Sequence, residues 1–286
     1  MPVTNKIKIF VACHKPTEIN SDDLYQPIHV GRAISTCIDQ MNMTGDDTGD
    51  NISEKNPFYS ELTAQFWAWK NYHESEFIGF CHYRRFFEGN LTGREINRIL
   101  SSEADVIVVG PCWRRYTRWN FLKTFVSSED LAIMQMVVRK MYPDYYKTLS
   151  EYAYDFVDYP LNMLICKKDL FDKYAEWLFS ILFECEKHVR LSSYSRARRL
   201  YGYLGEFLMP IYFIHNGCRM KAVGYHCVGE KGSRGGLSLF QKTARWVLRN
   251  GFYVKDKNRR LGIDYSVAAG LQSDGISILA NNDLII

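Results

Sequence analysis

Short apolar runs alternate with longer amphipathic stretches along residues 6–226. The runs have the length and the β-branched content of buried strands, and the longer stretches have helical spacing of their apolar residues. This alternation is typical of an α/β domain with a mostly parallel central sheet. The predicted strands are KIKIFVAC (6–13), FIGFC (77–81), ADVIVVGP (104–111), MLIC (163–166) and RMKAVGY (219–225), and the predicted helices lie within 93–103, 127–152, 167–189 and 198–216.

Two further segments complete the pattern. The stretch PFYSELTAQFWAWKNY (57–72) predicts a helix with Pro57 in its first turn and Ser60 as a cap. After residue 227 the pattern changes, because 228–236 has the composition of a linker and 237–250 is a basic amphipathic stretch. We therefore predict a main domain over residues 1–227 and a C-terminal extension over 228–286 that carries a basic amphipathic helix.

Composition narrows the function classes only slightly. The chain has 286 residues, 47% of them hydrophobic, and a formal net charge of +4, which does not call for a nucleic-acid partner. Its eight cysteines form no C-x-x-C pair, which favours reduced thiols over a zinc site or a disulfide framework. We find no signal-peptide pattern and no apolar run of about 18–20 residues, the length of a membrane span. A cytoplasmic protein is expected, and a position at the inner face of the plasma membrane stays open.

Polar side chains lie at the ends of three of the predicted strands. His14 and Lys15 come after the first strand, His82, Tyr83, Arg84 and Arg85 come after the strand 77–81, and Asn162 precedes MLIC. In open α/β sheets, ligands bind at the carboxyl ends of the strands.

Arg84 and Arg85 stand out within FIGFCHYRRFF, residues 77–87. Guanidinium groups remain charged at any working pH and match phosphate oxygens, so two of them at a strand end suit a diphosphate. The alternative is a pair of surface arginines, or one that bridges to an acid on a helix.

Four acidic residues are further candidates: Asp46, Asp47 and Asp50 in one loop, and Glu206. Asp46 and Asp47 are adjacent in the Gly-rich loop GDDTGDNIS, where they could bind a metal or simply form a solvated turn. Glu206 lies in LYGYLGEFLMPIYF with few charges near it in sequence. Desolvation would raise the pKa of such a carboxylate and suit it to general-base catalysis. The alternative is a partly exposed helix residue, or a partner of Arg198 or Arg199.

These stretches, in their order along the chain, resemble the DUF4422 family. The resemblance rests on GDDTGDNISEKNPFYSELTAQFWAWKN, FIGFCHYRRFF, YPLNMLICKKDLFDKYAEWLFSILFECE and RRLYGYLGEFLMPIYF, and it covers residues 6–226. Members occur in bacterial capsular and exopolysaccharide gene clusters, and some are assigned as inverting galactofuranosyltransferases that use UDP-galactofuranose.

The resemblance implies a UDP-sugar-dependent glycosyltransferase of GT-A-like fold over residues 1–227, acting in capsular, exopolysaccharide or O-antigen synthesis. In that fold a middle strand ends in an acidic D-x-D motif that holds a divalent metal on the diphosphate. Here GFCHYRR stands in that place, which leaves metal dependence open and lets Arg84 and Arg85 take over the neutralisation of the departing UDP. Glu206 falls where the general base is expected.

The remaining candidates are then expected to bind the donor. They are His14, Lys15, Asp46, Asp47, Asn51, His82, Tyr83 and Asn162. The implied partners are a nucleotide sugar and a lipid-linked glycan acceptor, and the basic helix either rests on the inner leaflet or packs on the catalytic domain. A non-catalytic nucleotide- or sugar-binding scaffold, and a metal-dependent hydrolase that uses Asp46 and Asp47, are the competing functions.

Overall fold

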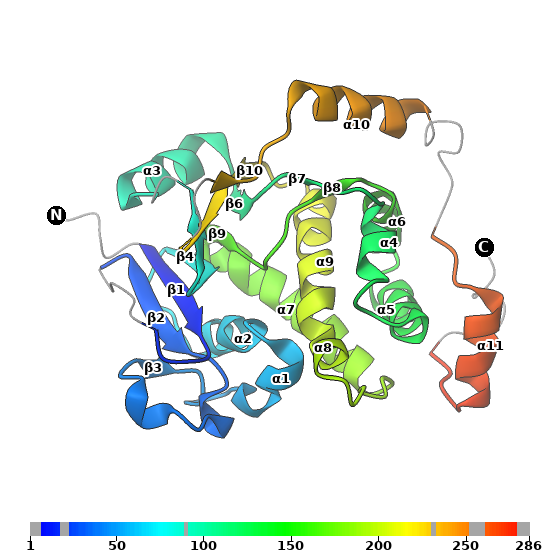
Figure 1. The fold of residues 1–286 in the computed structure, drawn as a ribbon, viewed down its shortest axis with the longest axis horizontal. Helices are drawn as coiled ribbons and strands as arrows, with labels where there is room; N and C mark the ends of the chain where they lie inside the picture. The colour runs from blue at the N-terminus through cyan, green and yellow to red at the C-terminus, as the bar shows by residue number, and fades with distance from the viewer. Residues whose placement is uncertain (1–6, 18–22, 89–90, 230–232, 252–260, 279–286) are drawn as a thin grey trace. The chain divides into compact units, whose positions relative to one another are not determined.

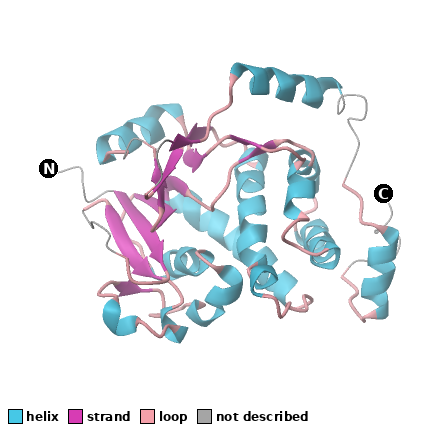
Figure 2. Ribbon diagram, viewed as in Figure 1, coloured by secondary structure: helices cyan, strands magenta, loops and turns pink. Residues whose placement is uncertain are grey.

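The computed structural model describes residues 7–17, 23–88, 91–229, 233–251 and 261–278. Its chain forms two compact units that are each discontinuous in sequence. Unit 1 comprises Met1–Cys112, Tyr159–Glu176 and Asn216–Gly236, and unit 2 comprises Trp113–Asp158, Trp177–His215 and Leu237–Ile286. Figure 2 shows that most strands belong to unit 1 and that unit 2 is built mainly from helices. The predicted division into a catalytic domain that ends at residue 227 and a C-terminal extension stays a prediction. The two compact units describe how the chain packs, and they do not identify the residues that catalyse.

Unit 1 is an α/β unit around one large sheet with the strand order β10-β6-β9-β4-β1-β2-β3 (Figure 1). The pairs β1–β2, β1–β4, β2–β3 and β6–β10 are parallel, and β9 is antiparallel to both β4 and β6. The mostly parallel sheet is therefore confirmed. The bounds are β1 Ile7–Cys13, β2 Tyr25–His29, β3 Thr44–Gly45, β4 Phe77–His82, β6 Val106–Val109, β9 Leu164–Lys167 and β10 Met220–Val223.

A small antiparallel extension is attached to β4. Strand β5 (Arg85–Phe87) pairs with β4 and with β11 (Tyr225–Cys227), which in turn pairs with β12 (Ser233–Arg234). FIGFCHYRRFF is therefore a hairpin rather than a strand that simply ends, because Tyr83 and Arg84 form a turn between β4 and β5.

Alternation along the strands builds a core on each face of the sheet. Phe10 and Phe80 face one side, where Phe10 contacts Trp67 of α2 (Leu62–Asn71) and Phe80 contacts Phe171 of α7. Their neighbours Ile9, Val11 and Cys81 belong to the buried cluster on the other side, together with Ile96 of α3. The remaining helical elements of unit 1 are η2 Arg32–Ile34, η3 Ile38–Gln40, η4 Ser53–Lys55, α1 Asn56–Tyr59, α3 Gly93–Arg98, η5 Ile99–Glu103 and the first half of α7 Lys168–Glu186.

Gly79 shows how tightly the centre of the sheet is packed. A Cβ atom at this position would lie 2.8 Å from Ile165 Cγ1 and 3.1 Å from the carbonyl oxygen of Leu164. Only glycine lets β4 and β9 approach this closely, so the strand pairing depends on this residue.

The helix predicted over 57–72 is broken in two. Ser60 has φ 52° and ψ −131°, which ends α1 before α2 begins at Leu62. Ser60, which the sequence predicts as a cap, is the C-cap residue of α1, and the residue that precedes α2 is Glu61. The placement of Pro57 in a first turn is confirmed.

Unit 2 packs its helices around aromatic contacts. Trp119 and Tyr152 both contact Phe207, which joins α4, α6 and α9. A short strand pair is formed by β7 (Cys112–Trp113) and β8 (Val157–Asp158). The helices are α4 Arg118–Leu122, α5 Ser128–Met141, α6 Tyr145–Ala153, the second half of α7, α8 Ser195–Arg198, α9 Leu200–His215, α10 Leu239–Gly251 and α11 Tyr265–Ser273.

Among the described residues, none of the helices combines the length and the apolar content that crossing a bilayer requires. All eight cysteines are free thiols.

Candidate functional site

The carboxyl ends of β1 and β4 bring the first group of candidate residues to one edge of the sheet in unit 1. These strands run parallel with Ala12 opposite His82, and the N–H of Tyr83 donates to the carbonyl of Ala12. His14 and Lys15 follow β1 directly, and Arg84 follows Tyr83. Parallel pairing therefore places side chains that lie about 70 residues apart in the chain beside one another, as the strand-end rule predicts.

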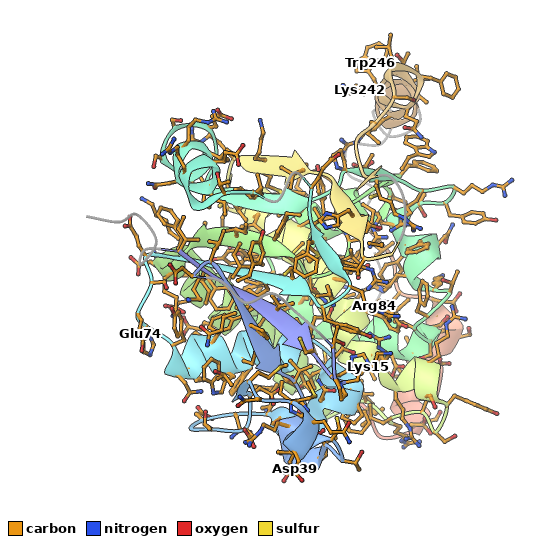
Figure 3. The ribbon with its side chains drawn as sticks, turned by 60° about the vertical axis from the view of Figure 1, so that its left-hand side comes forward. Lys15, Asp39, Glu74, Arg84, Lys242 and Trp246 are labelled. Atoms are coloured by element: carbon orange, nitrogen blue, oxygen red, sulfur yellow. The ribbon has the colours of Figure 1, made fainter. Side chains whose placement is uncertain are left out.

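Tyr83 is the centre of this group. Its ring is buried, and the Lys15 Nζ and Arg84 Cζ atoms lie 5.9 Å and 4.9 Å from the ring centroid. The His14 ring meets it edge to face at 5.2 Å. Figure 3 shows Lys15 and Arg84 near each other on this side of unit 1. An aromatic face attracts cations, so Tyr83 holds the two charged groups in place.

Among the residues that the structure describes, no carboxylate neutralises the charges on this edge. Lys15 and Arg84 are exposed, and among the described residues neither forms an ion pair with a carboxylate. Two neighbouring cations with no acidic partner in the described part of the chain create a local positive potential that attracts an anionic ligand. We name Lys15, Tyr83 and Arg84 the cation–tyrosine cluster.

Arg85 has a different environment from Arg84. It is the first residue of β5, it is half-buried, and it pairs with both His82 and Cys227 in the ladder. The two arginines therefore do not form one fork, and only Arg84 lies over Tyr83.

A second group of polar residues is connected to this edge through His82. The His82 ring, through Nε2, forms a 2.8 Å hydrogen bond with the carbonyl oxygen of Leu161. Asn162, the next residue, donates from Nδ2 to Glu61 Oε1 at 2.7 Å, and Gln65 Nε2 donates to the Asn162 carbonyl at 2.9 Å. These bonds fix the turn before β9 against the start of α2.

The turn carries backbone strain. Leu161 and Asn162 have φ values of 79° and 50°, and Ser60, beside Glu61 in the chain, has φ 52°. Non-glycine residues in this region cost about 1–3 kcal/mol each and are concentrated at functional sites. Glu61 was not singled out by sequence reasoning, since only the fold brings it to Asn162.

The acidic loop forms a structural anchor. The buried Asp46 carboxylate accepts hydrogen bonds from the N–H groups of Gly31 and Arg32, at 2.9 Å and 3.1 Å, and from the Ser53 hydroxyl. Burial lowers the pKa of the neighbouring His29, and the negative charge of Asp46 offsets this only in part.

Asp47 and Asn51 also have partners inside the loop. Asp47 forms an ion pair with Arg32 at 2.9 Å, and Asn51 Nδ2 donates to the Gly49 carbonyl. With the Asp46 oxygens taken up by three donors, these residues do not fit a metal site. Among the described residues, no group of three or more His, Cys, Asp or Glu side chains is arranged to hold a metal ion.

Glu206 belongs to unit 2, on α9, and is half-buried. Burial lowers the pKa of the Arg118 guanidinium, but Tyr152, Asp158 and Glu206 raise it, and the net direction is upward. Few charges lie near Glu206 in the sequence, but the fold brings Arg118, which is 88 residues earlier in the chain, close enough for the Glu206 charge to raise the Arg118 pKa. The role of Glu206 as a base stays a prediction.

Arg118 belongs to a buried ionic cluster in unit 2. Its Nη2 atom lies 3.0 Å from Asp158 Oδ1, and Arg114 Nε donates to Asp158 Oδ2 at 2.8 Å. Arg118 is 1% exposed and Asp158 is fully buried. One carboxylate thus holds two guanidinium groups, and we name these three residues the Asp158 cluster.

Comparisons with known proteins agree with this architecture. The chain is similar to the solved apo structure of WbbM, described as a bifunctional glycosyltransferase, with 28% identity and a TM-score of 0.70. The match covers 82% of this chain and 47% of that one, so the chain spans about half the length of this relative. No curated protein matches the chain. The sequence pattern of a family described as "Domain of unknown function (DUF4422)" matches residues 8–217, and the chain therefore belongs to the DUF4422 family.

Proposed function

We propose that this protein is a glycosyltransferase that moves a sugar from a UDP-sugar donor to a glycan acceptor. Support comes from its family and from its likeness to a solved glycosyltransferase. The observation that carries the proposal is the cation–tyrosine cluster at the carboxyl edge of β1 and β4. We assign the donor as UDP-galactofuranose and the acceptor as a lipid-linked glycan of capsular, exopolysaccharide or O-antigen synthesis in the cytoplasm.

The cluster suits the diphosphate of the donor. Arg84 and Lys15 are held by one buried ring, so little side-chain freedom is lost when they contact phosphate oxygens. The bond between the anomeric carbon and the diphosphate oxygen breaks during transfer, and negative charge grows on the departing UDP. Preorganised positive groups stabilise such charge more than they stabilise the ground state. In this proposal Arg84 and Lys15 supply the neutralisation.

Transfer proceeds by a single displacement that inverts the anomeric centre. The acceptor oxygen forms the new bond to the anomeric carbon, UDP leaves with the electron pair of the broken bond, and the acceptor proton passes to a carboxylate. We assign Glu206 as this base. Glu61 is a carboxylate of unit 1 that accepts a hydrogen bond from Asn162, and its substitution can be compared with that of Glu206.

The proposal is tested by measuring UDP release and glycan product by mass spectrometry. UDP-galactofuranose, UDP-galactose and UDP-glucose are each supplied with a lipid-linked acceptor, with and without EDTA. We expect turnover with UDP-galactofuranose that EDTA leaves unchanged. Absence of turnover with every donor, together with absence of UDP binding by calorimetry, would overturn the proposal, and activity lost in EDTA would overturn metal independence.

Replacing the base distinguishes an enzyme from a scaffold. We expect Glu206→Gln to lower the rate by about 10²–10⁴-fold, the range for losing a general base, while UDP affinity is retained. Glu61→Gln serves as the matched variant, and we expect it to retain the larger share of activity. If Glu61→Gln lowered the transfer rate more than Glu206→Gln does, Glu61 rather than Glu206 would be assigned as the base. Binding of UDP without any transfer by the parent protein would favour the non-catalytic scaffold.

A further inference from the structure

Helix α10 is amphipathic, with a basic side and an apolar side. Phe240, Ala244 and Val247 recur at the spacing that places them on one face of a helix, and Leu239 adjoins that face. Along the sequence of the helix, the basic residues Lys242, Arg245 and Arg249 fall on the opposite side, and the segment contains no Asp or Glu.

The orientation of α10 is opposite to that of a helix packed on its own domain. Arg245, on the basic side, forms an ion pair with Asp155 of unit 2, and its Nε lies 3.2 Å from Asp155 Oδ1. On the other side, Leu239 and Phe240 are each 81% exposed, and Val247 is 47% exposed. The basic side is therefore tied to the protein, and the apolar side faces solvent.

The edge of the basic side that adjoins Leu239 has the composition of a membrane-interface segment. Trp246 is 67% exposed and Lys242 is exposed, and Figure 3 shows both on this helix. A tryptophan ring and a lysine stem each combine an apolar body with a polar tip, which suits the headgroup level of a bilayer.

Charge decides which partner covers the apolar side. Within α10, Leu239–Gly251, the sequence carries three basic residues and no acidic residue. Two copies of this chain meeting on α10 would bring like charges together, whereas an anionic lipid surface attracts them.

We propose that α10 docks on an anionic lipid surface. Leu239, Phe240 and Val247 enter the boundary between headgroups and acyl chains, and Lys242 contacts lipid phosphates. The Arg245–Asp155 pair holds the apolar side outward and so presents it to the lipid. This surface belongs to the part of unit 2 that follows residue 217, outside the matched family region.

The test is sedimentation of the full chain with vesicles. Vesicles of phosphatidylglycerol and phosphatidylcholine are compared with vesicles of phosphatidylcholine alone. We expect binding to the anionic vesicles only, and the double variant Phe240→Glu/Val247→Glu should lower the partition coefficient at least about tenfold. Lys242→Glu should lower it about fivefold, and added salt should shrink that difference.

The control is Tyr194→Glu, since Tyr194 is an exposed aromatic residue of unit 2 that lies outside α10 and is 79% exposed. It should bind vesicles as the parent protein does, and all variants should share the parent melting temperature. Equal vesicle binding by the parent and the double variant would overturn the proposal. So would a parent dimer in light scattering that the double variant dissociates, because a second copy would then be the partner.

Discussion

Two arginines of this protein show how differently one side chain is used in its two units. Arg84 in unit 1 is exposed, lies over the ring of Tyr83, and has no carboxylate partner among the described residues. Arg118 in unit 2 is almost fully buried and is held by Asp158, which also binds Arg114. The first leaves its charge available, whereas the second has its charge neutralised within the fold.

The difference shows that a cationic side chain is best judged as a ligand contact by whether a carboxylate of the protein pairs with it, and not by its residue type. A buried charge is tolerated only with a well-placed partner, so the Asp158 cluster belongs to the architecture of unit 2. An exposed charge held by an aromatic ring costs little, and its field extends into solvent. Substitutions in the two places should therefore change different measured quantities.

The largest effect is expected for Asp158→Ala. This substitution leaves Arg118 buried without its closest carboxylate, and we expect unfolding free energy to fall by about 3–5 kcal/mol. Urea denaturation followed by circular dichroism measures it. The variant Asp158→Asn, which keeps hydrogen-bond acceptance but loses the charge, should lose less. A change below about 1 kcal/mol for Asp158→Ala would place the cluster among the energetically neutral ion pairs.

An intermediate effect is expected for Arg84→Ala, on binding rather than on stability. Loss of a charge-assisted hydrogen bond should weaken UDP binding by about 1–3 kcal/mol, whereas unfolding free energy should change by at most about 0.5 kcal/mol. Isothermal calorimetry with UDP measures the first quantity.

Arg85→Ala is the matched variant for this experiment. Because Arg85 is half-buried at the start of β5, we expect a smaller loss of UDP affinity than for Arg84→Ala. Unchanged UDP affinity in both variants would remove the arginines from the donor site.

The smallest effect is expected for Asp105→Ala in unit 1. Asp105 forms an exposed ion pair with Arg219 at 3.0 Å, and hydrogen bonds from Arg219 lower the pKa of Asp105. Exposed pairs of this kind contribute about 0–1 kcal/mol, since water and salt screen them. Comparing the loss of unfolding free energy in Asp105→Ala with that in Asp158→Ala measures how much burial adds to the contribution of an ion pair. Equal losses would show that burial does not separate the two pairs.

The sequence predicts strands and long helices well because their apolar periodicity is local. The strand expected at 77–81 is β4, Phe77–His82, and the strand expected at 163–166 is β9, Leu164–Lys167. The antiparallel direction of β9 was not visible, since strand direction depends on where the chain travels between strands. The break at Ser60 was not predicted either, because no helix-breaking residue marks it in the sequence. The side chains of Asn56 and Thr63 stabilise it by donating hydrogen bonds to the Ser60 carbonyl.

The site was predictable only where it depends on strand ends. His14, Lys15 and Arg84 meet because β1 and β4 are parallel, and the general rule for α/β sheets identifies that edge. Asp46 resembled a ligand-binding acid, but two of its three donors are backbone groups 14 and 15 residues earlier, which composition cannot reveal. The contact between Glu61 and Asn162 spans 101 residues and was equally invisible.

The C-terminal edge of the large sheet has a practical consequence for making shorter versions of the protein. The matched family region ends at residue 217, yet β10 (Met220–Val223) pairs with β6, and β11 (Tyr225–Cys227) pairs with β5. A fragment that stops at residue 217 would uncover the main-chain edge of β6, a strand of Val and Ile only. Unprotected apolar edges of this kind recruit other chains and aggregate. A fragment that ends after residue 236 keeps both pairings and should aggregate more slowly in storage.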